Sequence, residues 1–108
     1  MTDTTSTPSA TELLAPLREQ LDEVDRQVLA LLVRRMHLCL DVAGLKAQHD
    51  IPMMQPARMG LVVRRAREHA AAHGLPPDYL GCVYEHIAAA TCTQEDALID
   101  RLCTGSEQ

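Results

Sequence analysis

The chain has 108 residues, a net charge of −5 and 46% hydrophobic residues, which is enough for one domain with a core. The acidic balance argues against nucleic acid or an anionic membrane as the main partner. With two Tyr and no Phe or Trp, the core must be aliphatic, which favours helices over sheets. No apolar run reaches 18 residues and no leader pattern opens the chain, so we expect a cytoplasmic protein without a membrane-spanning helix.

The ends of the chain are predicted to be tails around one domain. Residues 1–10 are rich in Thr and Ser and are expected to be disordered, as are residues 104–108, which leaves a helical domain over 11–103. Ser9 and Glu12 have the spacing of a capping box, which would start a helix near Thr11. Pro16 is best tolerated in a first turn, so a start near residue 15 is equally compatible with the sequence.

The first helix is predicted from about residue 12 to residue 49. Apolar residues recur every third or fourth position along one seam: Leu17, Leu21, Val24, Val28, Leu31, Leu38, Val42 and Leu45. A helix over residues 16–49 would be about 51 Å long, whereas a compact chain of this size is about 34 Å across. We therefore expect a second copy to cover the seam in a homodimer. A kinked helix in a monomeric bundle is the alternative, although no proline interrupts residues 17–49.

Three cations on this helix point to two places. Arg35 interrupts the apolar seam, and Lys46 follows it by three turns and lies within about 20° of it around the axis. Arg18 precedes Arg35 by seventeen residues and points about 100° away. Arg35 and Lys46 thus lie on one side of the helix, whereas Arg18 points to a different side.

The second helix is predicted over about 56–73, ending at Gly74, because Pro52 and Pro56 preclude a continuous helix. Arg58 would lie in its first turn, where a cation opposes the helix dipole, which invites a functional role. His69 and His73 have the spacing of a metal-binding pair. Because no third ligand is near in the sequence, we expect two exposed histidines and no metal.

The third helix is predicted over about 77–102, with Thr91 and Glu95 one turn apart on its inward face. A buried carboxylate must be protonated or must face cations such as Arg35 and Lys46. The four cysteines, Cys39, Cys82, Cys92 and Cys103, are widely spaced, so we expect free thiols.

Together these polar residues predict a pocket of fixed cations inside an apolar wall, which suits a small dicarboxylate. No Ser–His pair, thiolate motif, metal cluster or phosphate loop is evident. Any reaction should therefore need only positioning and charge stabilisation, without a cofactor.

The pattern resembles the all-helical class of chorismate mutase over about residues 12–98. The resemblance rests on Leu17-Arg18, Asp25, Arg34-Arg35, Lys46, the loop from Pro52 to Arg58, Gly74-Leu75, Thr91 and Glu95. It implies an intertwined homodimer of three-helix chains with two sites, each completed by the partner's N-terminal arginine. It also implies a cofactor-free Claisen rearrangement.

Roles follow from the resemblance, position by position. Arg35, with Arg18 of the other subunit, would clamp the two carboxylates, and Lys46 would donate to the ether oxygen. Arg58 would support one carboxylate, and Thr91 would bind the ring carboxylate. Glu95 stands where the family usually has Gln facing the ether oxygen, so we expect its pKa to be raised by burial and the acid to be protonated.

A second departure concerns the substrate. Met59 stands where chorismate mutases usually have a Glu that binds the C4 hydroxyl. The loop Met53-Met54-Gln55-Pro56 looks like that of the 4-amino-4-deoxychorismate mutases of actinomycete antibiotic pathways. The resemblance therefore favours rearrangement of 4-amino-4-deoxychorismate to 4-amino-4-deoxyprephenate, toward p-aminophenylalanine, with Met54, Gln55 and Met59 at the substrate.

Three other functions stay open on the sequence. The chain could be a chorismate mutase with an atypical loop, or an isochorismate pyruvate-lyase, which also lacks the Glu after its loop arginine. From a different class, it could be a non-catalytic helical dimer that binds a dicarboxylate. The inward polar groups on all three helices argue against the last.

Overall fold

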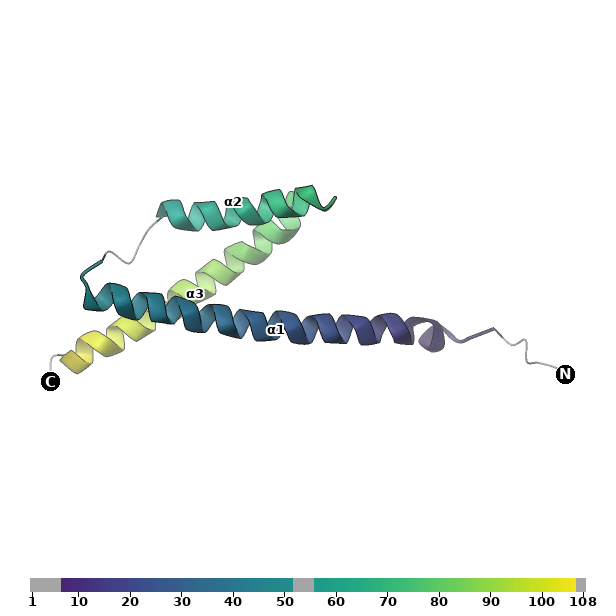
Figure 1. Cartoon of the computed structure of the whole chain (residues 1–108), viewed down its shortest axis with the longest axis horizontal. Helices are drawn as coiled ribbons and strands as arrows, with labels where there is room; N and C mark the ends of the chain where they lie inside the picture. Colours follow the sequence, from purple (N-terminus) through teal and green to yellow (C-terminus); the bar gives the residue numbers. More distant parts are fainter. Residues whose placement is uncertain (1–6, 52–55, 107–108) are drawn as a thin grey trace. The chain divides into compact units, whose positions relative to one another are not determined.

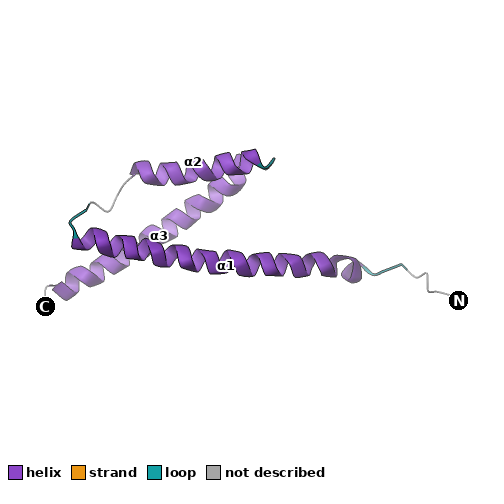
Figure 2. Ribbon diagram, viewed as in Figure 1, coloured by secondary structure: helices purple, strands orange, loops and turns teal. Residues whose placement is uncertain are grey.

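A computed structural model describes residues 7–51 and 56–106, which form three helices (Figures 1 and 2). They are α1 (Ala10–Gln48), α2 (Pro56–Ala72) and α3 (Pro77–Ser106). This confirms the predicted all-α class with three helices, although α3 continues past the predicted end at 102. Met54 and Gln55 lie outside the described residues. None of the described helices is both long and apolar enough to cross a membrane.

The chain divides into two units, Met1–Arg35 and Met36–Gln108. The first unit contains the N-terminal part of α1. The second contains the C-terminal part of α1 together with α2 and α3. α1 is helical through the boundary.

A capping box starts α1 in the first unit. The Ser9 N–H donates to Glu12 Oε1 over 2.9 Å, and the Glu12 N–H donates to Ser9 Oγ over 3.1 Å. Hydrogen bonding to the Ser9 backbone N–H, and then to the Ser9 side chain, lowers the pKa of the Glu12 carboxyl. Of the two predicted starts, the capping box is therefore the correct one. Pro16 consequently lies inside the helix instead of in its first turn.

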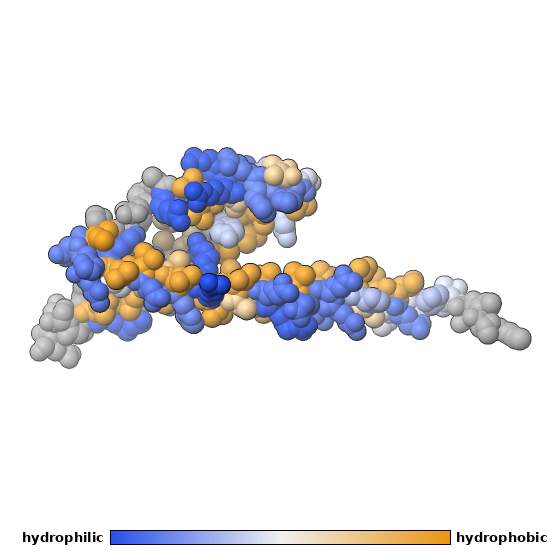
Figure 3. Space-filling model, viewed as in Figure 1, coloured by the Kyte–Doolittle hydropathy of each residue, from blue (hydrophilic) through white to orange (hydrophobic). Residues whose placement is uncertain are grey.

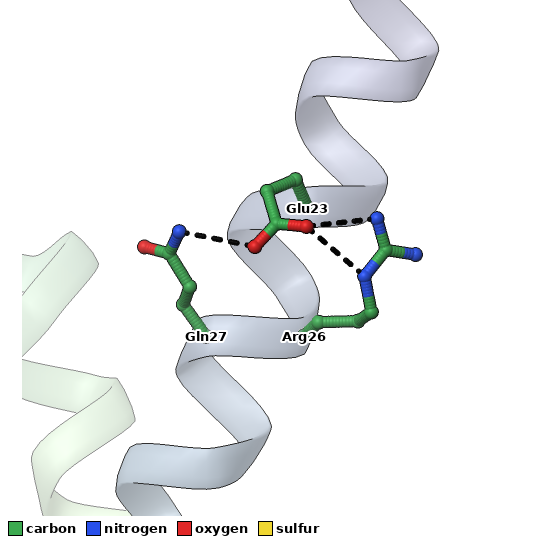
Figure 4. Close-up of polar contacts among 3 residues, drawn as sticks. All are labelled: Glu23, Arg26 and Gln27. Carbon is green, nitrogen blue, oxygen red and sulfur yellow. Dashed lines mark hydrogen bonds and ion pairs between the residues drawn. The ribbon is translucent and has the colours of Figure 1, made fainter.

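The apolar seam of α1 is exposed in the first unit. Leu17, Leu21 and Leu31 are 57%, 59% and 60% exposed, and Figure 3 shows hydrophobic residues along one side of α1. Another face of the helix is polar. There Glu23 Oε1 accepts a hydrogen bond from Arg26 Nη2 over 3.0 Å and Glu23 Oε2 accepts one from Gln27 Nε2 over 3.2 Å (Figure 4). This amphipathic helix needs an apolar surface to cover its seam.

In the second unit, α2 and α3 pack against each other through small residues. Ala66 and Ala70 on α2 and Gly81 on α3 are buried. A Cβ on Gly81 would lie 2.8 Å from Arg67 Cγ, so glycine allows the stem of Arg67 to cross α3 closely. Arg67 Nη1 then donates to Asp78 Oδ1 in the first turn of α3. The pair is exposed, so the close packing contributes more to the hairpin than the ion pair does.

Two left-handed residues end α1 and α2. Gly74 has a φ of 75°, and the Leu75 N–H donates to the Ala70 carbonyl over 2.9 Å, as in a Schellman motif. This confirms Gly74 as the predicted stop. Asp50 has a φ of 56°, and the Ile51 N–H donates to the Lys46 carbonyl over 2.9 Å. The backbone is therefore fixed by hydrogen bonds at the turn that carries Lys46.

Candidate active site

Lys46 lies in the last turn of α1 and is half-buried. A cation at this end of a helix is stabilised by the helix dipole. Its carbonyl accepts the capping hydrogen bond from Ile51, so its backbone is held on the helix. A half-buried ammonium on a fixed backbone can serve as a directed hydrogen-bond donor.

Thr91 and Glu95 occupy successive turns of α3. Thr91 is polar but buried, with 6% of its surface exposed. Its Oγ1 donates to the Ile87 carbonyl over 2.7 Å. Glu95 is half-buried, which agrees with an inward-facing but not fully enclosed carboxyl group.

The Cys92 thiol lies three residues before Glu95 on α3 and is half-buried. Burial raises the pKa of Cys92, and the nearby charges of Glu95, Asp96 and Cys39 raise it further. Cys92 was predicted as a free thiol without a place in the site. Its spacing of three residues from Glu95 was the signal that could have placed it there.

Arg58 lies in the first turn of α2, as predicted, and its side chain is exposed. That turn contains no acidic residue, so nothing in it compensates either the cation or the free N–H groups of the helix start. A helix N-terminus and a guanidinium together favour a negatively charged ligand. This arrangement is compatible with a carboxylate at Arg58.

Met59 is half-buried and faces a different space from Arg58. It lines an open hollow of about 440 Å³ between α2 and α3, together with Val63, Ala88 and others. Arg58, Thr91 and Glu95 are not among the residues that line this hollow. Adjacent helical residues point about 100° apart, which explains the separation of Met59 from Arg58. The hollow is therefore not the predicted dicarboxylate pocket, although it reaches the residue expected at the C4 end of the substrate.

Arg18 and Arg35 belong to the first unit, where Arg18 is exposed and Arg35 is half-buried. Both lie on α1, and seventeen residues of helix separate them by about 26 Å along the axis. A small substrate held by Arg35 cannot reach Arg18 of the same chain. If both arginines bind one substrate, the second must come from another copy.

Comparison with known proteins identifies the class. Residues 17–96 match the family model of chorismate mutase type II. The chain therefore belongs to the chorismate mutase type II family and is an isomerase with chorismate mutase-type activity.

Individual relatives agree with this assignment. The chain is 38% identical to a 4-amino-4-deoxychorismate mutase of Streptomyces pristinaespiralis over 95 residues, covering 88% of this chain and 74% of the relative. It is 40% identical to a 4-amino-4-deoxychorismate mutase of Streptomyces venezuelae over 88 residues, covering 82% and 85%. A chorismate mutase of Methanocaldococcus jannaschii is 36% identical over 64 residues, covering 59% and 65%.

Proposed function

We propose that the protein rearranges 4-amino-4-deoxychorismate to 4-amino-4-deoxyprephenate without a cofactor. The observation that carries the choice of substrate is Met59, a half-buried thioether at the position where the resemblance places a carboxylate. A thioether accepts hydrogen bonds only weakly, so Met59 cannot anchor a C4 hydroxyl as Glu would. The two Streptomyces relatives, which carry the name of this activity, support the same choice.

The chemistry assigned to the site is electrostatic. Arg35 and the partner subunit's Arg18 bind the two carboxylates and hold the flexible substrate in a compact chair, with Arg58 and Thr91 supporting them. The C–O bond of the enol ether breaks as the new C–C bond forms, and negative charge grows on the ether oxygen. Lys46 donates to that oxygen, and a preorganised donor of this kind lowers the barrier by about 3 kcal/mol. Protonated Glu95 donates from a second direction.

The site requires a homodimer, and the surface of the chain supports one. In the first unit, Leu17, Leu21 and Leu31 on the seam of α1 are each more than half exposed. Apolar side chains exposed along one face are typical of a surface that a partner covers. No large side chain among the described residues is fully buried. A second copy covering the seam of α1 would bury the apolar side chains of that seam.

A parallel substrate assay tests the proposal. The purified protein is given 4-amino-4-deoxychorismate, chorismate or isochorismate, and the products are identified by mass spectrometry. We expect 4-amino-4-deoxyprephenate to form with the highest kcat/KM. A higher kcat/KM with chorismate would make the protein a chorismate mutase, the second candidate, which the Methanocaldococcus relative favours. Release of pyruvate from isochorismate would make it a lyase, and binding without turnover would leave a dicarboxylate-binding dimer.

A further inference from the structure

The two histidines at the end of α2 lie side by side, away from the proposed active site. The ring centroids of His69 and His73 are 4.5 Å apart, with the ring planes inclined at 48°. Both residues are exposed. Within the residues that the structure describes, neither ring has a salt bridge to another side chain. Both imidazoles are thus available to a ligand from solvent.

The ring separation fits one metal ion held by both imidazoles. A ring nitrogen lies about 2.1 Å from a bound divalent metal, which puts the ring centre about 3.2 Å away, so rings meeting the metal at about 90° have centres about 4.5 Å apart. A tetrahedral angle would need centres about 5.2 Å apart. The observed 4.5 Å therefore matches adjacent positions of a square-planar or octahedral ion.

The backbone that carries the pair is fixed before any metal binds. The His73 N–H donates to the His69 carbonyl over 3.2 Å and to the Ala70 carbonyl over 3.1 Å. Gly74 then closes the helix with its left-handed φ of 75°. Because these bonds hold the two residues one helical turn apart, chelation costs only side-chain conformational entropy and little backbone entropy.

The sequence alone predicted no metal here, but the side-by-side rings change that interpretation. We propose that His69 and His73 form a chelating site for a divalent transition metal, with Ni²⁺ and Cu²⁺ preferred over Zn²⁺. The preference follows from the separation of the ring centroids and from the general order in which divalent metals bind nitrogen ligands. Groups of three or more metal-ligating side chains are absent from the described residues, so water fills the remaining positions. The bound metal is therefore exchangeable. We do not expect the site to bind Mg²⁺, because Mg²⁺ prefers oxygen ligands.

Calorimetric titration of the metal-free, full-length protein tests the site, with NiCl₂ as the main probe and ZnCl₂ and MgCl₂ as comparisons. We expect one Ni²⁺ per chain, weaker Zn²⁺ binding and no Mg²⁺ binding. His69→Ala and His73→Ala should each weaken Ni²⁺ binding at least about tenfold, because one imidazole alone has no chelate effect. His86 is an exposed histidine on α3, so His86→Ala should leave the affinity for Ni²⁺ unchanged.

A matched variant keeps the number of histidines and removes only the spacing. Ala71→His combined with His73→Ala places the second imidazole two residues from His69, on a different face of α2. This variant should bind Ni²⁺ as weakly as His73→Ala alone. Affinity equal to that of the unmodified chain, or equal losses from His86→Ala and His69→Ala, would overturn the proposal. Mutase assays of the metal-free variants should be unchanged, so the outcome is independent of the substrate assignment.

Discussion

Thr91 Oγ1 donates its hydrogen to the carbonyl oxygen of Ile87 over 2.7 Å, from a side chain that is only 6% exposed. A carboxylate can only accept hydrogen bonds, so Thr91 can bind the ring carboxylate only by turning its hydroxyl away from Ile87. The free energy that Thr91 contributes to substrate binding is therefore the difference between a hydrogen bond to a charged carboxylate and one to a neutral carbonyl.

The role of this hydroxyl can be measured with two variants of similar volume. Thr91→Val should raise KM by roughly 3- to 10-fold, because a hydrogen bond to a charged group is lost while one to a carbonyl no longer has to be broken. Thr91→Ser should keep KM near that of the unmodified enzyme. Steady-state kinetics of both variants check this. If Thr91→Val and Thr91→Ser had the same KM, the Thr91 hydroxyl would not bind the substrate.

Met59 is expected to determine whether the enzyme prefers a substrate with an amino group or a hydroxyl group at C4. Met59→Glu supplies an acceptor for a C4 hydroxyl and should raise the ratio of kcat/KM for chorismate over 4-amino-4-deoxychorismate by about tenfold or more. Met59→Leu, which keeps an apolar side chain of similar size, should leave the ratio unchanged. Competition between the two substrates measures it directly. Equal ratios in all three proteins would show that Met59 does not select the substrate.

Glu95 should make activity depend on pH. If the protonated acid donates to the ether oxygen, kcat/KM must fall as the pH rises and the group ionises, because a carboxylate repels the growing negative charge. Glu95→Gln donates without titrating, so its profile should lose this falling limb. Asp96→Asn, at the exposed neighbouring position, should retain it. Loss of activity in Glu95→Gln at every pH would contradict the role.

The capping box of α1 should also respond to acid. The pKa of Glu12 is lowered in the folded chain by its two bonds with Ser9. The stabilisation is therefore complete above the unfolded pKa and is lost as the pH falls through the folded pKa. Ser9→Ala should reduce the amide-exchange protection of the first turn near Leu13 at neutral pH. In the unmodified chain, the same loss should appear only in acid. Unchanged protection in Ser9→Ala would show that other contacts hold this turn.

Local signals in the sequence predicted the fold well. The seam of α1, the stop at Gly74 and the three helices were correct because each depends on neighbours within one or two turns. The capping box and Pro16 gave conflicting starts for α1. The structure shows that the reciprocal bonds of Ser9 and Glu12 outweigh the helix position that proline prefers.

Features that depend on two helices were not predictable in this way. The close approach of Arg67 to Gly81 and the hollow lined by Met59 arise only when α2 packs on α3. The same holds for the effect of Cys39 on the pKa of Cys92. For the site, the sequence could supply residue types and helix faces, whereas the hollow that Met59 lines required the packed hairpin.

The central claim is that each site combines Arg35 of one chain with Arg18 of the other. Chains carrying only Arg18→Ala and chains carrying only Arg35→Ala should each be nearly inactive. When the two variants are unfolded together and refolded, half of the dimers contain one chain of each kind and have one intact site. The mixture should therefore regain about a quarter of the unmodified activity. A mixture as inactive as its separate components, with mixed dimers shown to be present, would contradict the shared site.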